Sequence, residues 1–245
     1  MRERKHRGTG RQWFVALVVA CILAAGSANG ATITFRSGDD GGAIGSADPN
    51  VRVLPGPIVT GFTSPLTPDD FAAARAGNPA IIVSASEVLA DPVARYINPT
   101  GGNNGVPLGL YAIRIDNTEG YATDATLVLY YRVDDLLGSY ASDHSTIVTA
   151  AVYLNDEPLT DIDGRLAPPY PPVGMNYDQV QHEFHFTGLT LLAGENWIYI
   201  NATNLERTYG AVAFSGTLTF TPVPEPVSLL VLAVGAAGLL SRRRR

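Results

Sequence analysis

The chain has 245 residues, with 17 lysines and arginines, 23 aspartates and glutamates, and a single cysteine. Residues 31–221 hold eight arginines and 21 acidic residues, a formal net charge of −13, which argues against nucleic acid as a partner. The cysteine, Cys21, lies outside this region, which excludes disulfides and thiol chemistry from it. Packing alone must therefore stabilise one domain of about 190 residues.

Residues 1–30 have the order of a secretory signal peptide. Five basic side chains among residues 2–11 precede an apolar core from Trp13 to Ala25 and a stretch of small residues. Signal peptidase is expected to cleave after Ala28 or Gly30. Because the basic segment contains no adjacent pair of arginines, the general secretion route is favoured over the twin-arginine route.

The first half of residues 31–221 predicts one strand and one or two short helices. Apolar and polar residues alternate over residues 31–36, and a Pro/Gly-rich connecting segment follows at 49–68. Thr67, Pro68, Asp69 and Asp70 supply a cap, a first-turn proline and two carboxylates for a helix that Gly77 ends. A second helix is predicted over residues 86–96, bent or broken at Pro92.

From residue 108 onward the pattern is β. Six segments of six to ten residues are rich in Val, Ile, Tyr, Thr and Phe and are separated by turn residues: 108–115, 125–133, 147–154, 180–186, 197–202 and 211–220. In the second segment, Leu127, Leu129, Tyr131 and Val133 share one face, and Val128, Tyr130 and Arg132 share the other. Short strands without intervening helices predict an all-β fold, an antiparallel sandwich.

Residues 222–245 have the order of a sorting signal. Val223, Pro224, Glu225 and Pro226 precede an apolar run at 227–240 and a basic tail of Arg242, Arg243, Arg244 and Arg245. As a helix the run covers about 21 Å, which is short of the roughly 30 Å hydrocarbon core. The arginines favour a cytoplasmic end for the run, and the prolines keep the tetrapeptide extended. The alternative is an ordinary tail anchor, which is usually longer.

This C-terminal pattern resembles the PEP-CTERM signal of Gram-negative bacteria. The resemblance implies a protein that is exported, held transiently in the inner membrane and processed by an exosortase, and that ends at the cell surface or in the extracellular matrix. Such families are associated with exopolysaccharide-producing bacteria, so the resemblance also implies exopolysaccharide as a partner.

Two segments between residues 108 and 221 resemble galactose-binding-like jelly-roll domains. Ala151-Val152-Tyr153-Leu154-Asn155-Asp156 is similar to a strand and turn of that family, except that Asp156 stands where glycine is usual. Residues 191–200, with Gly194 and Asn196, are similar to the start of one of its hairpins. The resemblance implies a jelly-roll sandwich. These motifs describe backbone turns, so they indicate architecture and no particular ligand.

Two groups of residues raise the question of a metal. His182 and His185 are three residues apart in a predicted strand, so they are expected to point to opposite faces and to share no metal. Asp156, Glu157, Asp161 and Asp163 place four carboxylates within eight residues, and calcium binds six to eight oxygen ligands from such loops. The alternative is an acidic surface loop, and no other cofactor is expected.

Tyrosines in predicted loops are the candidates for binding carbohydrate. Tyr170 and Tyr177 lie in a Pro/Gly-rich loop at 167–178, Tyr140 lies near Ser139, Asp143 and His144, and Tyr209 follows Arg207. Sugars stack on aromatic rings while Asp, Asn and Arg side chains bond their hydroxyls. The alternative at each position is a tyrosine that caps the core. No nucleophile elbow, catalytic triad or phosphate loop is present, so we expect a non-catalytic binding module. The rival interpretations are a purely structural matrix protein and a polysaccharide-acting enzyme.

Overall fold

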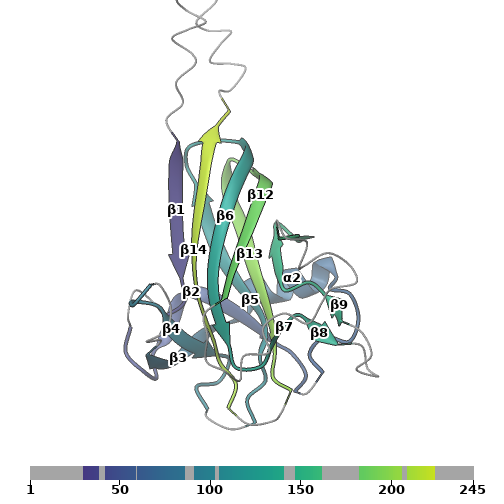
Figure 1. The fold of residues 1–245 in the computed structure, drawn as a ribbon. Helices are drawn as coiled ribbons and strands as arrows, with labels where there is room; N and C mark the ends of the chain where they lie inside the picture. Colours follow the sequence, from purple (N-terminus) through teal and green to yellow (C-terminus); the bar gives the residue numbers. More distant parts are fainter. Residues whose placement is uncertain are drawn as a thin grey trace, which may run out of the picture.

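A computed structural model describes residues 30–38, 42–58, 60–85, 91–102, 105–140, 147–161, 182–205 and 209–223. Of Ala85, Tyr140 and Ile147 only the backbone is described. The described residues form fourteen strands and one helix (Figure 1), namely β1 (Ala31–Arg36), β2 (Ala47–Pro55), α2 (Pro68–Ala76), β3 (Asn78–Ala85), β4 (Arg95–Asn98), β5 (Gly109–Asn117), β6 (Ala122–Val133), β7 (Leu136–Leu137), β8 (Ser139–Tyr140), β9 (Ile147–Thr149), β10 (Val152–Leu154), β11 (Glu157–Pro158), β12 (His182–Leu191), β13 (Gly194–Thr203) and β14 (Val212–Pro222).

Helix α2 begins as the sequence predicts. The Thr67 hydroxyl oxygen accepts a hydrogen bond from the backbone N–H of Asp70, and the Asp70 carboxylate accepts one from the backbone N–H of Thr67. This reciprocal pair satisfies two N–H groups that a helix start leaves without partners. Gly77 follows the last turn, so the predicted helix and both of its ends are confirmed.

The predictions of a second helix and of a Pro/Gly-rich connecting segment were wrong in part. Arg95 and Tyr96 belong to strand β4, where they pair with Ala85 and Ser84 of β3. Pro92 cannot donate a helical hydrogen bond, which leaves these residues free to join the sheet. Strand β2 occupies residues 47–55 and so overlaps the predicted connecting segment. Its prolines are tolerated because Pro49 lies within a register shift and Pro55 at the strand's end, where a missing N–H costs no ladder hydrogen bond.

Twelve of the strands form one antiparallel sheet that curls into two facing layers. The order is β11-β10-β13-β5-β2-β3-β4-β14-β6-β12, with β1 added to β14 and β7 to β13. In Figure 1 the front layer is β1, β14, β6 and β12, the back layer contains β5 and β13, and β2, β3 and β4 join them at the lower end. The predicted all-β, antiparallel sandwich is therefore confirmed.

The core lies between the two layers and follows the predicted alternation. Leu127, Leu129, Tyr131 and Val133 of β6 are buried, whereas Val128, Tyr130 and Arg132 are partly exposed on the outer face. The Tyr131 ring stacks on Phe184 with 4.7 Å between ring centroids, which joins β6 to β12 inside the core. A two-residue alternation is therefore enough to orient this strand.

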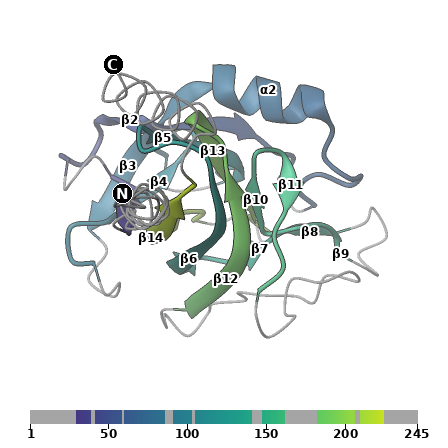
Figure 2. The same ribbon diagram turned by 90° about the horizontal axis from the view of Figure 1, so that it is seen from above.

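Helix α2 covers the outer face of the back layer (Figure 2). Phe71 packs against Tyr153 and Tyr199, with ring centroids 5.1 and 4.8 Å apart. Arg75 donates hydrogen bonds to the Tyr199 hydroxyl and to the Asp156 carboxylate. Phe71, Tyr153 and Tyr199 belong to a second, smaller core. Among the described residues, no helix covers the outer face of the front layer.

The two asparagines of the jelly-roll-like segments hold two hairpins together. The Asn155 amide donates to Asn196 Oδ1 at 2.8 Å, and Asn155 Oδ1 accepts from the backbone N–H of Trp197 at 2.9 Å. Asn155 and Asp156 form the two-residue turn between β10 and β11, with φ values of 50° and 70°, as a turn of type I′ requires. Aspartate thus replaces the usual glycine without loss of the tight turn, and Arg75 pairs with its carboxylate at 3.0 Å.

The chain enters and leaves the folded domain at the same end. Ala31, the first residue of β1, pairs with Phe220 of β14, and both strands reach the top of Figure 1 there. No helix among the described residues is long and apolar enough to cross a membrane. Except for Gly30, Pro222 and Val223, the predicted signal peptide and the predicted sorting segment lie outside the described residues.

Tyr111 provides a test of the core. Its side chain is fully buried, and its hydroxyl has no hydrogen-bond partner among the residues that the structure describes. Because burying an unpaired hydroxyl costs free energy, Tyr111→Phe is expected to raise the free energy of unfolding by about 1 kcal/mol. Tyr153→Phe is the matched control, since the Tyr153 hydroxyl accepts a hydrogen bond from the backbone N–H of Ala150 at 2.8 Å. It should lower that free energy in urea titrations, and changes of equal sign in the two variants would contradict the assignment.

Candidate functional site

Of the four candidate tyrosines, the structure describes the side chain of Tyr209 alone. Tyr170 and Tyr177 lie outside the described residues, and the backbone of Tyr140 forms strand β8 with Ser139. The Tyr209 hydroxyl lies 3.4 Å from Ser84 Oγ, and its side chain is partly exposed. The residues around Tyr209 therefore decide whether it can bind carbohydrate.

The four candidate calcium ligands are placed differently from one another. Asp156 is held by Arg75, and the exposed Glu157 starts β11. Asp161 is buried, and its carboxylate accepts a hydrogen bond from the backbone N–H of His185 at 2.6 Å. Asp163 lies outside the described residues, and within the described part of the chain no three acidic, histidine or cysteine side chains are grouped as metal ligands. Asp156 and Asp161 thus have structural partners.

The two histidines of β12 point to opposite faces, as predicted. The His182 ring stacks on Tyr131 with 5.5 Å between centroids, on the inner side of the front layer. His185 is exposed on the outer face, where its Nε2 lies 2.7 Å from a Glu183 carboxylate oxygen. The pair therefore cannot bind one metal ion between them.

Three tyrosines and an arginine gather on the outer face of the front layer, at the end away from the chain termini. We call Tyr96, Tyr130, Arg132 and Tyr209 the outer-face patch; all four are partly exposed. The Arg132 guanidinium carbon lies 5.5 Å from the centroid of the Tyr96 ring, within the range of a cation–π contact. Tyr96 pairs across β3 and β4 with Ser84, which joins it to Tyr209.

Small residues form the floor of the outer-face patch. Ala94 and Ala213 are fully buried, and Tyr96 and Tyr130 pack against them. Ala213 pairs with Arg132 across β14 and β6, so the arginine side chain extends over a methyl group to reach the Tyr96 ring. Larger side chains at the two alanines would fill this space. The side chains of Tyr96, Tyr130 and Arg132 therefore lie partly exposed next to two small buried residues.

Burial and neighbouring charged groups shift the pKa values of the Tyr96 and Tyr130 hydroxyls. Burial raises the pKa of Tyr96 to about 12, even though the Arg132 charge acts in the opposite direction. A hydrogen bond with the Glu183 carboxylate raises the pKa of Tyr130. Both phenols therefore stay neutral at physiological pH and keep an O–H donor. Aromatic faces beside an arginine, a serine and carboxylates are the groups that bind sugar rings and their hydroxyls.

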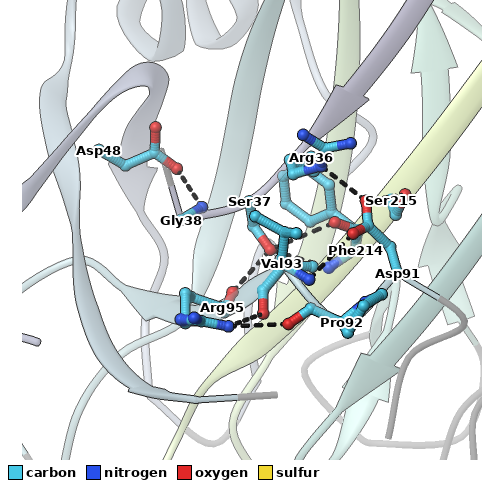
Figure 3. Close-up of polar contacts among 11 residues, drawn as sticks. Arg36, Ser37, Gly38, Asp48, Asp91, Pro92, Val93, Arg95, Phe214 and Ser215 are labelled. Carbon is cyan, nitrogen blue, oxygen red and sulfur yellow. Dashed lines mark hydrogen bonds and ion pairs between the residues drawn. The ribbon is translucent and has the colours of Figure 1, made fainter. Parts of the chain in front are cut away.

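A polar network beside the outer-face patch fixes the strands beneath it (Figure 3). Asp91 accepts hydrogen bonds from Arg36 Nε at 2.6 Å, from Ser215 Oγ at 3.0 Å and from the backbone N–H of Val93 at 3.0 Å. Burial alone would raise the pKa of Asp91, but these three donors together lower it. Arg36 and Ser215 are neighbours on β1 and β14, so Asp91 joins the loop before β4 to the front layer.

The sequence identified part of the outer-face patch. Tyr209 was a candidate, and the alternation in β6 put Tyr130 and Arg132 on one face. Tyr96 was missed because it was assigned to a helix. The signal that could have found it is Arg95-Tyr96-Ile97, an alternating segment with β-forming residues that directly precedes turn residues.

No protein-family model matches the chain, and no curated protein matches it. Among solved structures it is similar to a CBM35 from Paenibacillus barcinonensis, at 11% identity and a TM-score of 0.34 over 78% of this chain and 99% of that one. It is also similar to a GH26-CBM35 β-(1,4)-mannanase from Podospora anserina, at 12% identity and a TM-score of 0.33 over 80% of this chain.

A family two carbohydrate esterase from Cellvibrio japonicus is similar at 9% identity and a TM-score of 0.28 over 80% of this chain. The chain spans 28% of the mannanase and 37% of the esterase. At such identities and TM-scores, the function has to be argued from the side chains of this chain.

Proposed function

We propose that this chain is an exported, non-catalytic β-sandwich module that binds polysaccharide through the outer-face patch. The observation that supports it most is Arg132 held over the Tyr96 ring on a floor of alanines, with Tyr130 and Tyr209 at either side. Rigid aromatic rings lose little conformational freedom on binding, and the arginine offers donors in a fixed plane.

The charge of the domain narrows the class of polysaccharide. Residues 31–221 carry a formal net charge of −13, which repels an acidic polymer over distances up to the Debye length of about 8 Å at physiological salt. The single arginine of the outer-face patch cannot offset that charge. An uncharged polysaccharide of the extracellular matrix is therefore the proposed ligand.

The proposed route of export is the one that the two end segments imply. Signal peptidase removes residues 1–30, segment 227–240 holds the chain transiently in the inner membrane, and an exosortase cleaves at Val223-Pro224-Glu225-Pro226. The boundaries of the folded domain support this division, since β1 begins at Ala31 and β14 ends at Pro222. The final location is the surface or the matrix of a Gram-negative cell.

Binding is tested by affinity electrophoresis of the secreted domain in gels that contain neutral or acidic exopolysaccharide. Tyr209→Ala and Arg132→Gln are each expected to weaken the retardation by neutral polymer about tenfold, which corresponds to about 1.4 kcal/mol per lost contact. Tyr121→Ala is the control, because Tyr121 is an exposed tyrosine at the opposite end of the domain. Its retardation should match the wild type.

Two outcomes would contradict this assignment. Equal retardation of Tyr209→Ala, Arg132→Gln and wild type would remove the outer-face patch as the site. A wild-type domain that no polysaccharide retards would favour the purely structural matrix protein. Export is tested separately, by mass spectrometry of the protein from strains with and without the exosortase: a C-terminus at Arg245 in both strains would refute the sorting assignment.

A further inference from the structure

Three apolar side chains form a row at the end of the domain where the chain enters and leaves. Tyr121, Leu192 and Val223 are 42%, 48% and 43% exposed, and they are three of the four large apolar side chains that are exposed among the described residues. The backbone N–H of Val223 donates to the Tyr121 carbonyl at 2.7 Å. We call these three residues the apolar row.

The pairing of the strands sets the apolar row side by side. Ala122 of β6 pairs with Leu191 of β12 on one side and with Pro222 of β14 on the other, so the next residues, Leu192 and Val223, flank Tyr121. Ala122 and Leu191 are buried. Because side chains alternate between the two faces of a strand, the residues next to them are directed outward.

An open depression lies beside the apolar row. Its volume is about 450 Å³, and it is lined by Gly30, Thr123, Asp124, Thr221 and Val223 among others. Gly30 and Val223, the first and last described residues, therefore both line this depression. The segments 118–124, 191–195 and 221–223 contain three carboxylates, those of Glu119, Asp124 and Glu195, and no basic side chain.

The length of the tail decides what this end must face. Three residues separate Val223 from Val227, where the apolar segment begins, and four residue steps span at most about 14 Å. The polar headgroup layer of one leaflet is about 5–8 Å thick. When the segment is in the membrane, the end of the domain consequently lies at most about 9 Å from the headgroups.

From this geometry we propose that the apolar row docks on the lipid surface while the sorting tail is attached. The inference rests on the membrane-held intermediate of the proposed function. Tyrosine and aliphatic side chains suit the boundary between headgroups and acyl chains. Three side chains bind a bilayer weakly by themselves, but the tail supplies a high effective concentration, so docking ends when the tail is cleaved.

Docking would set the orientation of the outer-face patch. Arg132 is level with Ala213 at the start of β14, and the chain leaves the domain after Pro222. Nine residue steps along a strand amount to about 30 Å. The patch therefore lies at the end of the domain farther from the bilayer, about 30 Å along the strands from the apolar row, before the chain is released.

The test uses the full chain in phosphatidylcholine vesicles, with hydrogen exchange of residues 118–121 and 192–194 as the readout and co-flotation as the measure of tail insertion. Tyr121→Ser/Leu192→Ser is compared with Tyr209→Ser, which changes a partly exposed tyrosine at the other end. Exchange in these segments is expected to be about tenfold slower in wild type and Tyr209→Ser than in the double variant. In detergent the three chains should exchange alike.

The outcomes separate the docking proposal from the tail assignment and from polysaccharide binding. Equal exchange in all three chains, with full co-flotation, would overturn docking and leave the tail assignment intact. Failure of the wild type to co-float would overturn both. Protection that arises only in membranes containing the exosortase would identify a protein as the partner and overturn docking on lipid. Polysaccharide retardation of the secreted domain is unaffected by any of these results.

Discussion

Replacement of Asn196 by alanine is expected to lower the free energy of unfolding by about 3–4 kcal/mol. The side chain is fully buried, and its amide makes four hydrogen bonds between 2.8 and 3.1 Å. Two go to the carbonyls of Leu192 and Gly194, and two come from the Leu192 N–H and the Asn155 amide. Each contributes about 1 kcal/mol, and alanine would remove all four at once.

Urea titration of Asn196→Ala beside Asn50→Ala provides the measurement. Asn50 is an exposed asparagine within β2, so its substitution should change the free energy of unfolding by less than about 0.5 kcal/mol. Asn155→Ala shares one hydrogen bond with Asn196, and the double variant should therefore lose less than the sum of the two single losses. Similar losses in Asn196→Ala and Asn50→Ala would show that the two hairpins do not depend on this amide.

Gly216→Ala is expected to lower the free energy of unfolding by about 3 kcal/mol, for a steric reason. A Cβ atom at Gly216 would lie 2.1 Å from Cζ of the Phe35 ring. Phe35 is a buried side chain of the N-terminal strand β1, and its ring lies 6.4 Å from that of Phe214. The ring would have to leave its site, which costs about as much as removal of a buried phenylalanine.

A double-mutant cycle with Phe35→Ala tests whether the loss of stability comes from the clash with the Phe35 ring. Once the ring has been removed, Gly216→Ala meets no obstacle and should cost less than about 1 kcal/mol. Gly102→Ala is the control, because the nearest atoms to a Cβ there are at an ordinary 3.4 Å. If Gly216→Ala costs the same with and without the Phe35 ring, the loss arises from the backbone of β14 and the steric explanation is wrong.

Local patterns were sufficient where one strand buries one face. The alternation of β6 oriented Tyr130, Tyr131 and Arg132 correctly, because a residue on the wrong face would expose an apolar side chain or bury a charged one. The helix start at Thr67 was equally local, since a cap satisfies groups within one turn. Strands β2, β3 and β4 were not identified, because β2 and β3 contain prolines and β4 has only four residues. Pairing with other strands makes them extended.

By itself, the sequence determined the charge of −13, the all-β class and the turn asparagines. Each of these depends on composition or on neighbours a few residues apart. Only the tertiary structure brought Tyr96 under Arg132, Asn155 against Asn196, and Val223 beside Tyr121. These contacts join residues far apart in the chain, and their positions follow from strand order and register, which no local pattern specifies.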